Sequence, residues 1–179
     1  EHWDNIYHTK ELDQVSWYQP TPQTSLALIE KTGKGKDASI IDIGGGDSFL
    51  VDHLLENGYT NLSVLDISAK AIERAKVRLG SKASMVDWIV SDITEFDSVG
   101  EKYDVWHDRA AFHFLTTKED IEQYKEVLSN STEEGSSVII GTFSDSGPVK
   151  CSGIKIKQYS EAGFVHTFDD MLQLAELVN

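Results

Sequence analysis

Three aspartates stand where strand-like segments of the sequence end, and a carboxylate at such a place is suited to binding chemistry. The aspartates are Asp42, Asp66 and Asp92, and the segments are 38–43, 62–67 and 85–92. In an open parallel sheet, ligands bind outside the carboxyl ends of the strands, so these side chains are expected along one edge. A carboxylate accepts hydrogen bonds from two adjacent hydroxyls or from an amine. The spacing therefore predicts a site for a ligand that carries several hydrogen-bond donors.

Three consecutive glycines, Gly44, Gly45 and Gly46, follow the first of these segments and precede an amphipathic helix. The free N–H groups and the positive end of that helix favour electron-rich ligand atoms. A phosphate-binding loop would need lysine and then serine or threonine after its glycines, and a dinucleotide site would need a third glycine where Phe49 stands. Asp47 adds a negative charge that disfavours a pyrophosphate. The stretch therefore predicts a ligand without phosphates that contacts the backbone.

The side chains at the strand ends match the parts of a nucleoside that carries an ammonium group. The two oxygens of Asp66 suit the adjacent hydroxyls of a ribose, and Asp92 suits an exocyclic amine. Ile67 and Ile93 would then lie above and below a flat base. Asp42, together with the Gly44 carbonyl, is placed to receive the ammonium group. Taken singly, these positions also fit a tight turn, a helix cap and a surface turn.

The motifs "DIGGGDS" (42–48), "VLDIS" and "VSDI" resemble the cofactor motifs of class I S-adenosylmethionine-dependent methyltransferases. The resemblance implies that the glycines admit the methionine part, that Asp66 holds the ribose hydroxyls, and that Asp92 with Ile93 holds the adenine. "HWDNIY", "SWYQ", "YDVWHDRAAFHFL" and "KCSG" resemble a small bacterial-type branch of that family. Ser48 replaces the usual third small glycine. The resemblance implies S-adenosylmethionine as cofactor and methyl transfer as activity.

The pocket beside the cofactor is expected to draw its residues from two places in the chain. Trp17 and Tyr18 would cap the cofactor or form a wall. His107, Asp108 and Arg109 follow "YDVW" at the carboxyl edge of the sheet and are the candidate catalytic residues. Among them, His107 is a candidate general base and Arg109 a partner for a substrate carboxylate.

The same cluster has a plain alternative, in which Asp108 and Arg109 form a surface ion pair and the histidine is structural. A metal is not expected at His107 and His113, because cysteine ligands and close spacing are lacking. Methyl transfer from a sulfonium requires mainly that the nucleophile, methyl and sulfur lie in line and that water is excluded. No metal site is therefore predicted.

Strand-like and helical segments alternate along most of the chain, which predicts a doubly wound α/β fold with a mainly parallel sheet. One domain is expected over 1–179, with the segment 1–20 over the cofactor site. Helices are expected to begin at Thr21 and Pro22, with the threonine as cap, and at the capping box 117–120, which opens with Thr117. The last helix is expected near Thr167. No convincing sixth and seventh strands follow Ser144, so the C-terminal strands are expected to be missing or remodelled.

Composition narrows the classes of partner. The 30 acidic and 16 basic residues give a formal net charge of −14, which disfavours nucleic acid and anionic membranes. The single cysteine, Cys151, and the lack of a long apolar run or signal peptide point to a cytoplasmic protein. A small-molecule methyl acceptor is favoured, with a protein lysine and a catalytically inactive binding module as alternatives. Phe49 disfavours a nicotinamide-dependent oxidoreductase.

Overall fold

The computed structural model describes residues 2–9, 18–109 and 111–178. Helices and strands alternate from α2 to β3 and again from β4 to β5, whereas only a short 3-10 helix, Ile93–Glu95, lies between β3 and β4. In chain order the elements are α1 (His2–Thr9), α2 (Gln23–Lys31), β1 (Ser39–Ile43), α3 (Leu50–Glu56), β2 (Asn61–Asp66), α4 (Ala69–Leu79), β3 (Val86–Val90), β4 (Val105–Asp108), α5 (Lys118–Ser131), β5 (Ser137–Ile140), β6 (Lys150–Cys151), β7 (Ile154–Lys155) and α6 (Glu161–Phe168).

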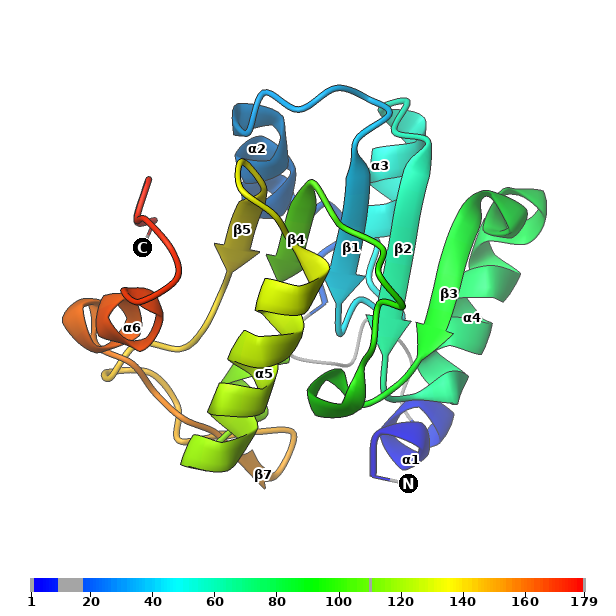
Figure 1. The fold of residues 1–179 in the computed structure, drawn as a ribbon. Coiled ribbons are helices and arrows are strands. Elements are labelled where there is room, and N and C mark those ends of the chain that lie inside the picture. Colours follow the sequence, from blue (N-terminus) through cyan, green and yellow to red (C-terminus); the bar gives the residue numbers. More distant parts are fainter. Residues whose placement is uncertain (1, 10–17, 110, 179) are drawn as a thin grey trace.

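Five parallel strands form the main sheet in the order β3-β2-β1-β4-β5 (Figure 1). The chain builds β1, β2 and β3 toward one side and then returns to place β4 and β5 on the other. The strand order therefore reverses between β1 and β4, which is where ligands bind in folds of this type. All five strands end at the lower edge of the sheet in Figure 1. The predicted doubly wound α/β fold is confirmed.

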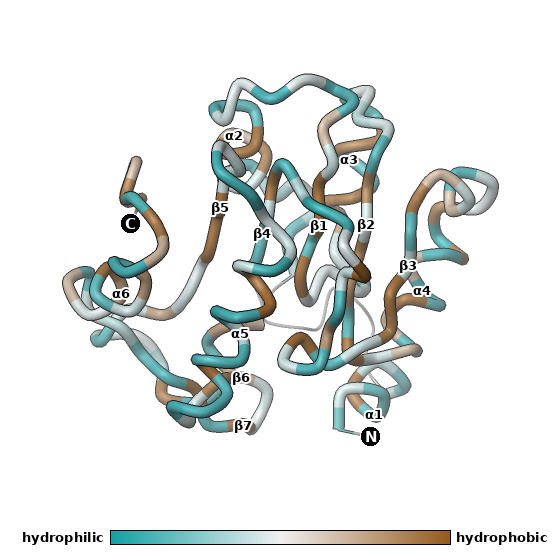
Figure 2. Tube along the Cα trace, in the orientation of Figure 1, coloured by the Kyte–Doolittle hydropathy of each residue, from teal (hydrophilic) through white to brown (hydrophobic). Residues whose placement is uncertain are grey.

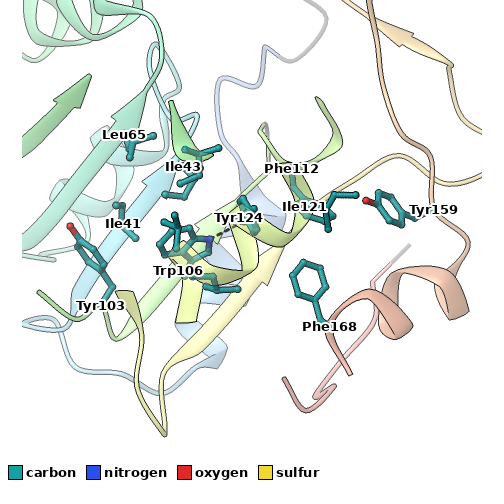
Figure 3. Packing of buried hydrophobic residues seen from close by; sticks show 13 residues of the cluster. Ile41, Ile43, Leu65, Tyr103, Trp106, Phe112, Ile121, Tyr124, Tyr159 and Phe168 are labelled. Atoms are coloured by element: carbon teal, nitrogen blue, oxygen red, sulfur yellow. Dashed lines mark hydrogen bonds between the residues drawn. The ribbon is translucent and has the colours of Figure 1, made fainter. Parts of the chain in front are cut away.

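Side chains that alternate along the strands fill two apolar cores, one on each face of the sheet. Ile41 and Trp106 are fully buried on the face covered by α5 and α6, among the aromatic side chains of Figure 3. Ile40 and Val105 point to the opposite face and pack with residues of α2 and α3. Figure 2 shows the matching hydrophobic stretches along β1, β3 and β5. Neighbouring residues of one strand consequently belong to different environments.

Two predicted helix starts have different outcomes. The start of α5 is confirmed, because Thr117 Oγ1 accepts a hydrogen bond of 3.1 Å from the Asp120 amide and caps the helix. The expected capping role of Thr21 is wrong. The residue at the N-cap of α2 is Pro22, which has no side-chain group to bond the first amides, and the helix begins at Gln23.

The chain after β5 departs from a plain continuation of the main sheet. β6 and β7 pair with each other as an antiparallel hairpin, joined by Ser152 and Gly153 with φ of 51° and 81°. Glycine suits such a left-handed turn position because it lacks a Cβ. Within the described residues, the region after β5 therefore adds no strand to the main sheet.

The last helix lies earlier than expected. Ser160 caps α6 by accepting from the Gly163 amide, and the helix ends at Phe168, so the prediction of a helix that begins near Thr167 was wrong. The Met171 and Leu172 amides both donate to the Phe168 carbonyl, at 3.0 and 2.8 Å. One turn thus reproduces the helix-like apolar spacing without a further helix.

Candidate functional site

The glycine stretch closes tightly over two of the predicted aspartates. Gly44 has a φ of 67°, and its amide donates to the Leu65 carbonyl at 2.7 Å. A Cβ on Gly45 would collide with the Asp42 carboxyl group, and one on Gly46 with the carboxyl group of Asp66. The strands themselves therefore require these glycines, because their terminal carboxylates lie directly under the loop.

Asp66 ends β2 beside that loop and is 5% exposed. Its Oδ1 accepts from the Ser68 amide at 2.8 Å, and the Gly46 amide also donates to the carboxyl group. Burial, reinforced by the nearby carboxylate of Asp42, raises the pKa of Asp66 to about 7, against the effect of these hydrogen bonds. A carboxylate offers about four lone-pair sites, so Asp66 retains capacity for two further donors.

The other predicted base-binding residues lie along the same edge. Ile67 directly follows β2 and is 51% exposed, whereas Ile93 is buried. Asp92 lies two residues beyond the end of β3, and its Oδ1 accepts from both the amide and the hydroxyl of Thr94, at 2.9 and 2.8 Å. The exposed isoleucine is the apolar surface on which a flat base can rest.

Asp42 belongs to a buried hydrogen-bonded chain that crosses from β1 to α2. The Asp42 Oδ1 and His107 Nδ1 atoms are 2.7 Å apart, and His107 Nε2 lies 2.9 Å from Ser25 Oγ. All three residues are at most 5% exposed. Both ring nitrogens of His107 are thus engaged, which favours a role in holding Asp42 over a role as a free general base.

The three candidate catalytic residues do not gather in one place. Asp108 is fully buried on the face opposite to His107, because successive side chains of β4 point to opposite sides of the sheet. Its carboxyl group accepts from the amide of Ala111 at 2.8 Å and from the hydroxyl of Tyr124 at 2.9 Å. The alternative of a surface Asp108–Arg109 pair is wrong for Asp108, which instead fixes the turn after β4. Arg109 is half-buried beside Gly141, where an added Cβ would lie 3.3 Å from the Arg109 Cγ.

Trp106 extends this buried network, because its indole N–H donates to the Tyr124 hydroxyl at 2.9 Å (Figure 3). The two rings meet edge to face, with centroids 5.9 Å apart. The turn after β4 is therefore anchored by polar bonds inside an aromatic core.

Asp47 does not face the space above the loop. It is 4% exposed and forms ion pairs with Arg74 (2.8 Å) and Arg78, both on α4. Arg78 also binds Asp52 through two nitrogens, at 3.0 and 2.9 Å, and donates to the Ser48 carbonyl. Sequence reasoning missed this clamp, although the four-residue spacing of the arginines on one helix face was a usable signal.

Helix α1 lies at the same edge of the sheet, beside α4 (Figure 1). The Ser68 hydroxyl donates to Asp4 at 2.6 Å, and Arg74 donates to the Tyr7 carbonyl at 2.8 Å. The ring of Trp3 packs on Phe114, 5.0 Å between centroids. One helix thus contacts both the β2 end and the segment after β4.

The predicted cofactor cap is described only in part. Tyr18 is exposed and meets the ring of Phe49, at the start of α3, edge to face at 6.0 Å. Trp17 lies outside the described residues.

His113, on the short 3-10 helix Phe112–Phe114 after β4, is buried without a polar partner in the described structure. Neither ring nitrogen has a hydrogen bond, and burial lowers the pKa of the imidazole to about 4. The rings of Phe114 and Phe143 lie 4.2 and 5.0 Å away. Buried polar groups are normally bonded, so this side chain stands out.

Within the described ranges, no group of histidine, cysteine and acidic side chains is arranged to hold a metal ion. No helix in those ranges is both long and apolar enough to cross a membrane.

Comparison with known proteins gives a family match over more than half of the chain. The family described as "Methyltransferase domain" matches residues 40–135, which run from β1 to the turn before β5. Among curated proteins, the eEF1A lysine and N-terminal methyltransferase of Mus musculus is 23% identical over 141 residues, which cover 79% of this chain and 20% of that protein. EEF1A lysine methyltransferase 2 of Mus musculus is 33% identical over 82 residues, covering 41% of this chain and 33% of that protein. The chain thus spans a fifth to a third of the curated relatives it matches.

Solved structures share the fold. The 1,6-didemethyltoxoflavin-N1-methyltransferase of Burkholderia thailandensis, solved with 1,6-didemethyltoxoflavin and S-adenosylhomocysteine, has a TM-score of 0.74. It is 16% identical, and the match covers 94% of this chain and 73% of that one.

Proposed function

Because this chain belongs to the family of methyltransferase domains, we propose that it transfers a methyl group from S-adenosylmethionine to a small-molecule acceptor. The observation that carries the proposal is the edge where the glycine loop, Asp42 and Asp66 converge beside the exposed Ile67. These groups suit a nucleoside with an ammonium tail and no phosphate. The two arginines nearest the loop are already paired with Asp47 and Asp52, which supports the same choice.

In this proposal each end of the cofactor has its own partners. Asp66 accepts from the ribose hydroxyls, Ile67 and Ile93 contact the adenine, and Asp92 accepts from its amino group through the oxygen that Thr94 leaves free. Asp42 and the backbone of Gly44–Gly46 hold the methionine end, and Tyr18 with Trp17 closes the site. S-adenosylmethionine, when bound, supplies an activated methyl group on sulfur.

The protein's own contribution is placement and the exclusion of water, since transfer from a sulfonium needs an in-line approach. The His107–Asp42 bond keeps one strand-end carboxylate oriented, and Asp108 fixes the turn that borders the acceptor side. We therefore assign His107 and Asp108 to positioning. Arg109 stays the candidate for a charged acceptor group.

A protein lysine is the second candidate acceptor, and the curated relatives named for lysine methylation favour it. The net charge of −14 would attract a basic protein surface. A lysine side chain attacks through nitrogen, and a small-molecule acceptor can do the same. The residues beside the transferred methyl group can therefore be the same for both acceptors.

Methyl-labelled S-adenosylmethionine distinguishes these acceptors when it is incubated with the protein and a cell extract separated into small molecules and macromolecules. Label in the small-molecule fraction supports the first proposal, and labelled protein bands support the second. Asp66→Ala is the negative control, because it should bind the cofactor poorly. Label in neither fraction, with the cofactor still bound, would leave a binding module and overturn methyl transfer.

A further inference from the structure

His113 belongs to the half of the sheet edge that the proposed cofactor does not use. The cofactor residues lie at the ends of β1, β2 and β3, whereas His113 follows β4 and touches Phe143, which follows β5. An acceptor must approach the methyl group from the side opposite to sulfur. In this sheet that approach comes from the β4 and β5 half, where His113 lies.

The backbone around His113 is held rigidly, although its side chain is not bonded. The His113 carbonyl accepts from the Lys157 amide at 2.8 Å, and Asp108 accepts from the amides of Ala111 and Phe112. A fully buried carboxylate therefore fixes the turn that carries an unpartnered imidazole. Such a placement is costly for stability, so it calls for a reason, and service to a ligand is one.

Aromatic rings form the described surroundings of the imidazole. Phe114 and Phe143 pack on it, and Trp3 of α1 packs on Phe114 in turn. The residue is 4% exposed, so the inference requires a neighbour such as Phe114 to move aside when an acceptor binds. Aromatic faces also stabilise a cationic product next to them.

The chemistry of a neutral imidazole selects the class of acceptor. A hydroxyl nucleophile needs a base strong enough to remove its proton, and a buried imidazole among phenyl rings is a weak one. A carboxylate or thiolate would need a positive partner, which this imidazole is not in its neutral form. An amine in its neutral form needs neither, because its lone pair attacks directly while an N–H points to the imidazole.

We propose that His113 hydrogen-bonds the nitrogen of an amine methyl acceptor and orients its lone pair toward the methyl group. The inference rests on the proposed methyl transfer. As the N–C bond forms, the C–S bond breaks and its electron pair stays on sulfur, which becomes a neutral thioether. The methylated nitrogen is then an ammonium, whose N–H remains bonded to His113 until the product leaves and its proton passes to water.

The test uses the whole chain with ¹⁵N-labelled histidine, saturated with S-adenosylhomocysteine and titrated with n-butylamine. The amine should shift a His113 ring-nitrogen resonance, whereas n-butanol and butyrate should leave it in place. In His113→Phe, amine binding is followed through the resonances of the residues that surround position 113. The affinity for the amine should fall about tenfold, which corresponds to the loss of one hydrogen bond. His113→Gln, which keeps an acceptor, should lose less.

Stability separates this role from a structural one. His113→Phe removes an unpartnered polar group from an aromatic site, so its melting temperature should equal or exceed that of the wild type while amine binding falls. Unchanged amine binding in His113→Phe, or a shift with butanol or butyrate instead, would overturn the inference. Failure of the wild type to bind S-adenosylhomocysteine would instead overturn the proposed function, so the two failures are distinguishable.

Discussion

At the scale of single residues, Asp66 links the chemistry of the site to pH. Burial raises its pKa to about 7, far above the ordinary value of 3.8. The folded protein therefore holds a proton that the unfolded chain releases, and the stability contribution of Asp66 falls as pH rises from about 4 through about 7. Only the ionised carboxylate accepts fully from both ribose hydroxyls, so the affinity for the cofactor should rise as the pH rises.

Asp66→Asn should therefore remove the pH dependence of cofactor affinity and the contribution of Asp66 to the pH dependence of stability. We expect the affinity of the wild type for S-adenosylhomocysteine to rise between pH 6 and pH 8, by about tenfold in line with the displaced titration. The variant should bind weakly and equally at both pH values, and its free energy of unfolding should fall less over the same range. Calorimetric titration and urea unfolding measure the two quantities. A variant that retains the wild-type pH profile would assign the titration to another group.

The Asp42–His107–Ser25 chain gives a second prediction at this scale. His107→Phe leaves the Asp42 carboxyl group buried without its ring partner, at a cost of about 2 kcal/mol or more in the free energy of unfolding. Ser25→Ala removes only the outer bond and should cost about 1 kcal/mol. Urea unfolding measures both. Equal losses in the two variants would mean that His107 does not support Asp42.

At the scale of elements, helix α1 is tied to the site through the cap of α4. Ser68 Oγ accepts from the Ala71 amide at 3.2 Å and donates to Asp4 of α1. Ser68→Ala should cost about 1 kcal/mol as a lost cap and should also loosen α1. Thr117→Ala is the matched control, because it removes the cap of α5, and it should lower the free energy of unfolding by a similar amount.

The rate of hydrogen exchange at the α1 amides distinguishes these two variants. Ser68→Ala should speed exchange in α1, and Thr117→Ala should not. Equal protection of α1 in both would show that the Asp4 contact does not hold the helix.

The elements that were predictable are those set by local pattern. The apolar strands and the glycine loop are predictable from the hydrophobic pattern and from the turn preferences of glycine. The position of α6 is not, because the turn at Phe168 gives the apolar residues after it the spacing of a helix. The strand-end aspartates lie at one edge because parallel strands end together. His107 and Asp108, although adjacent in sequence, point to opposite faces of the sheet, and the partners Ser25 and Tyr124 come from separate helices. Such contacts depend on tertiary packing, which spacing along the chain does not reveal.

At the scale of the whole molecule, 30 acidic residues outnumber 16 basic ones, so the negative charges of the folded protein repel one another on average. Salt shortens the screening length from about 30 Å at 0.01 M to about 8 Å at 0.15 M. We expect the melting temperature to rise over this range, because long-range repulsion is screened more than the buried ion pairs of Asp47. Calorimetric scans that show a fall would mean that ion pairs dominate.

Calorimetric titration with S-adenosylhomocysteine measures whether the edge formed by the glycine loop, Asp42 and Asp66 binds the cofactor. We expect one site per chain, with an affinity at least about tenfold weaker in Asp66→Ala because hydrogen bonds to a charged group are lost. Asp87→Ala, which removes an exposed carboxylate from β3, is the matched control and should bind like the wild type. Absence of binding to the folded wild type, or equal affinity in Asp66→Ala, would show that this edge is not the cofactor site.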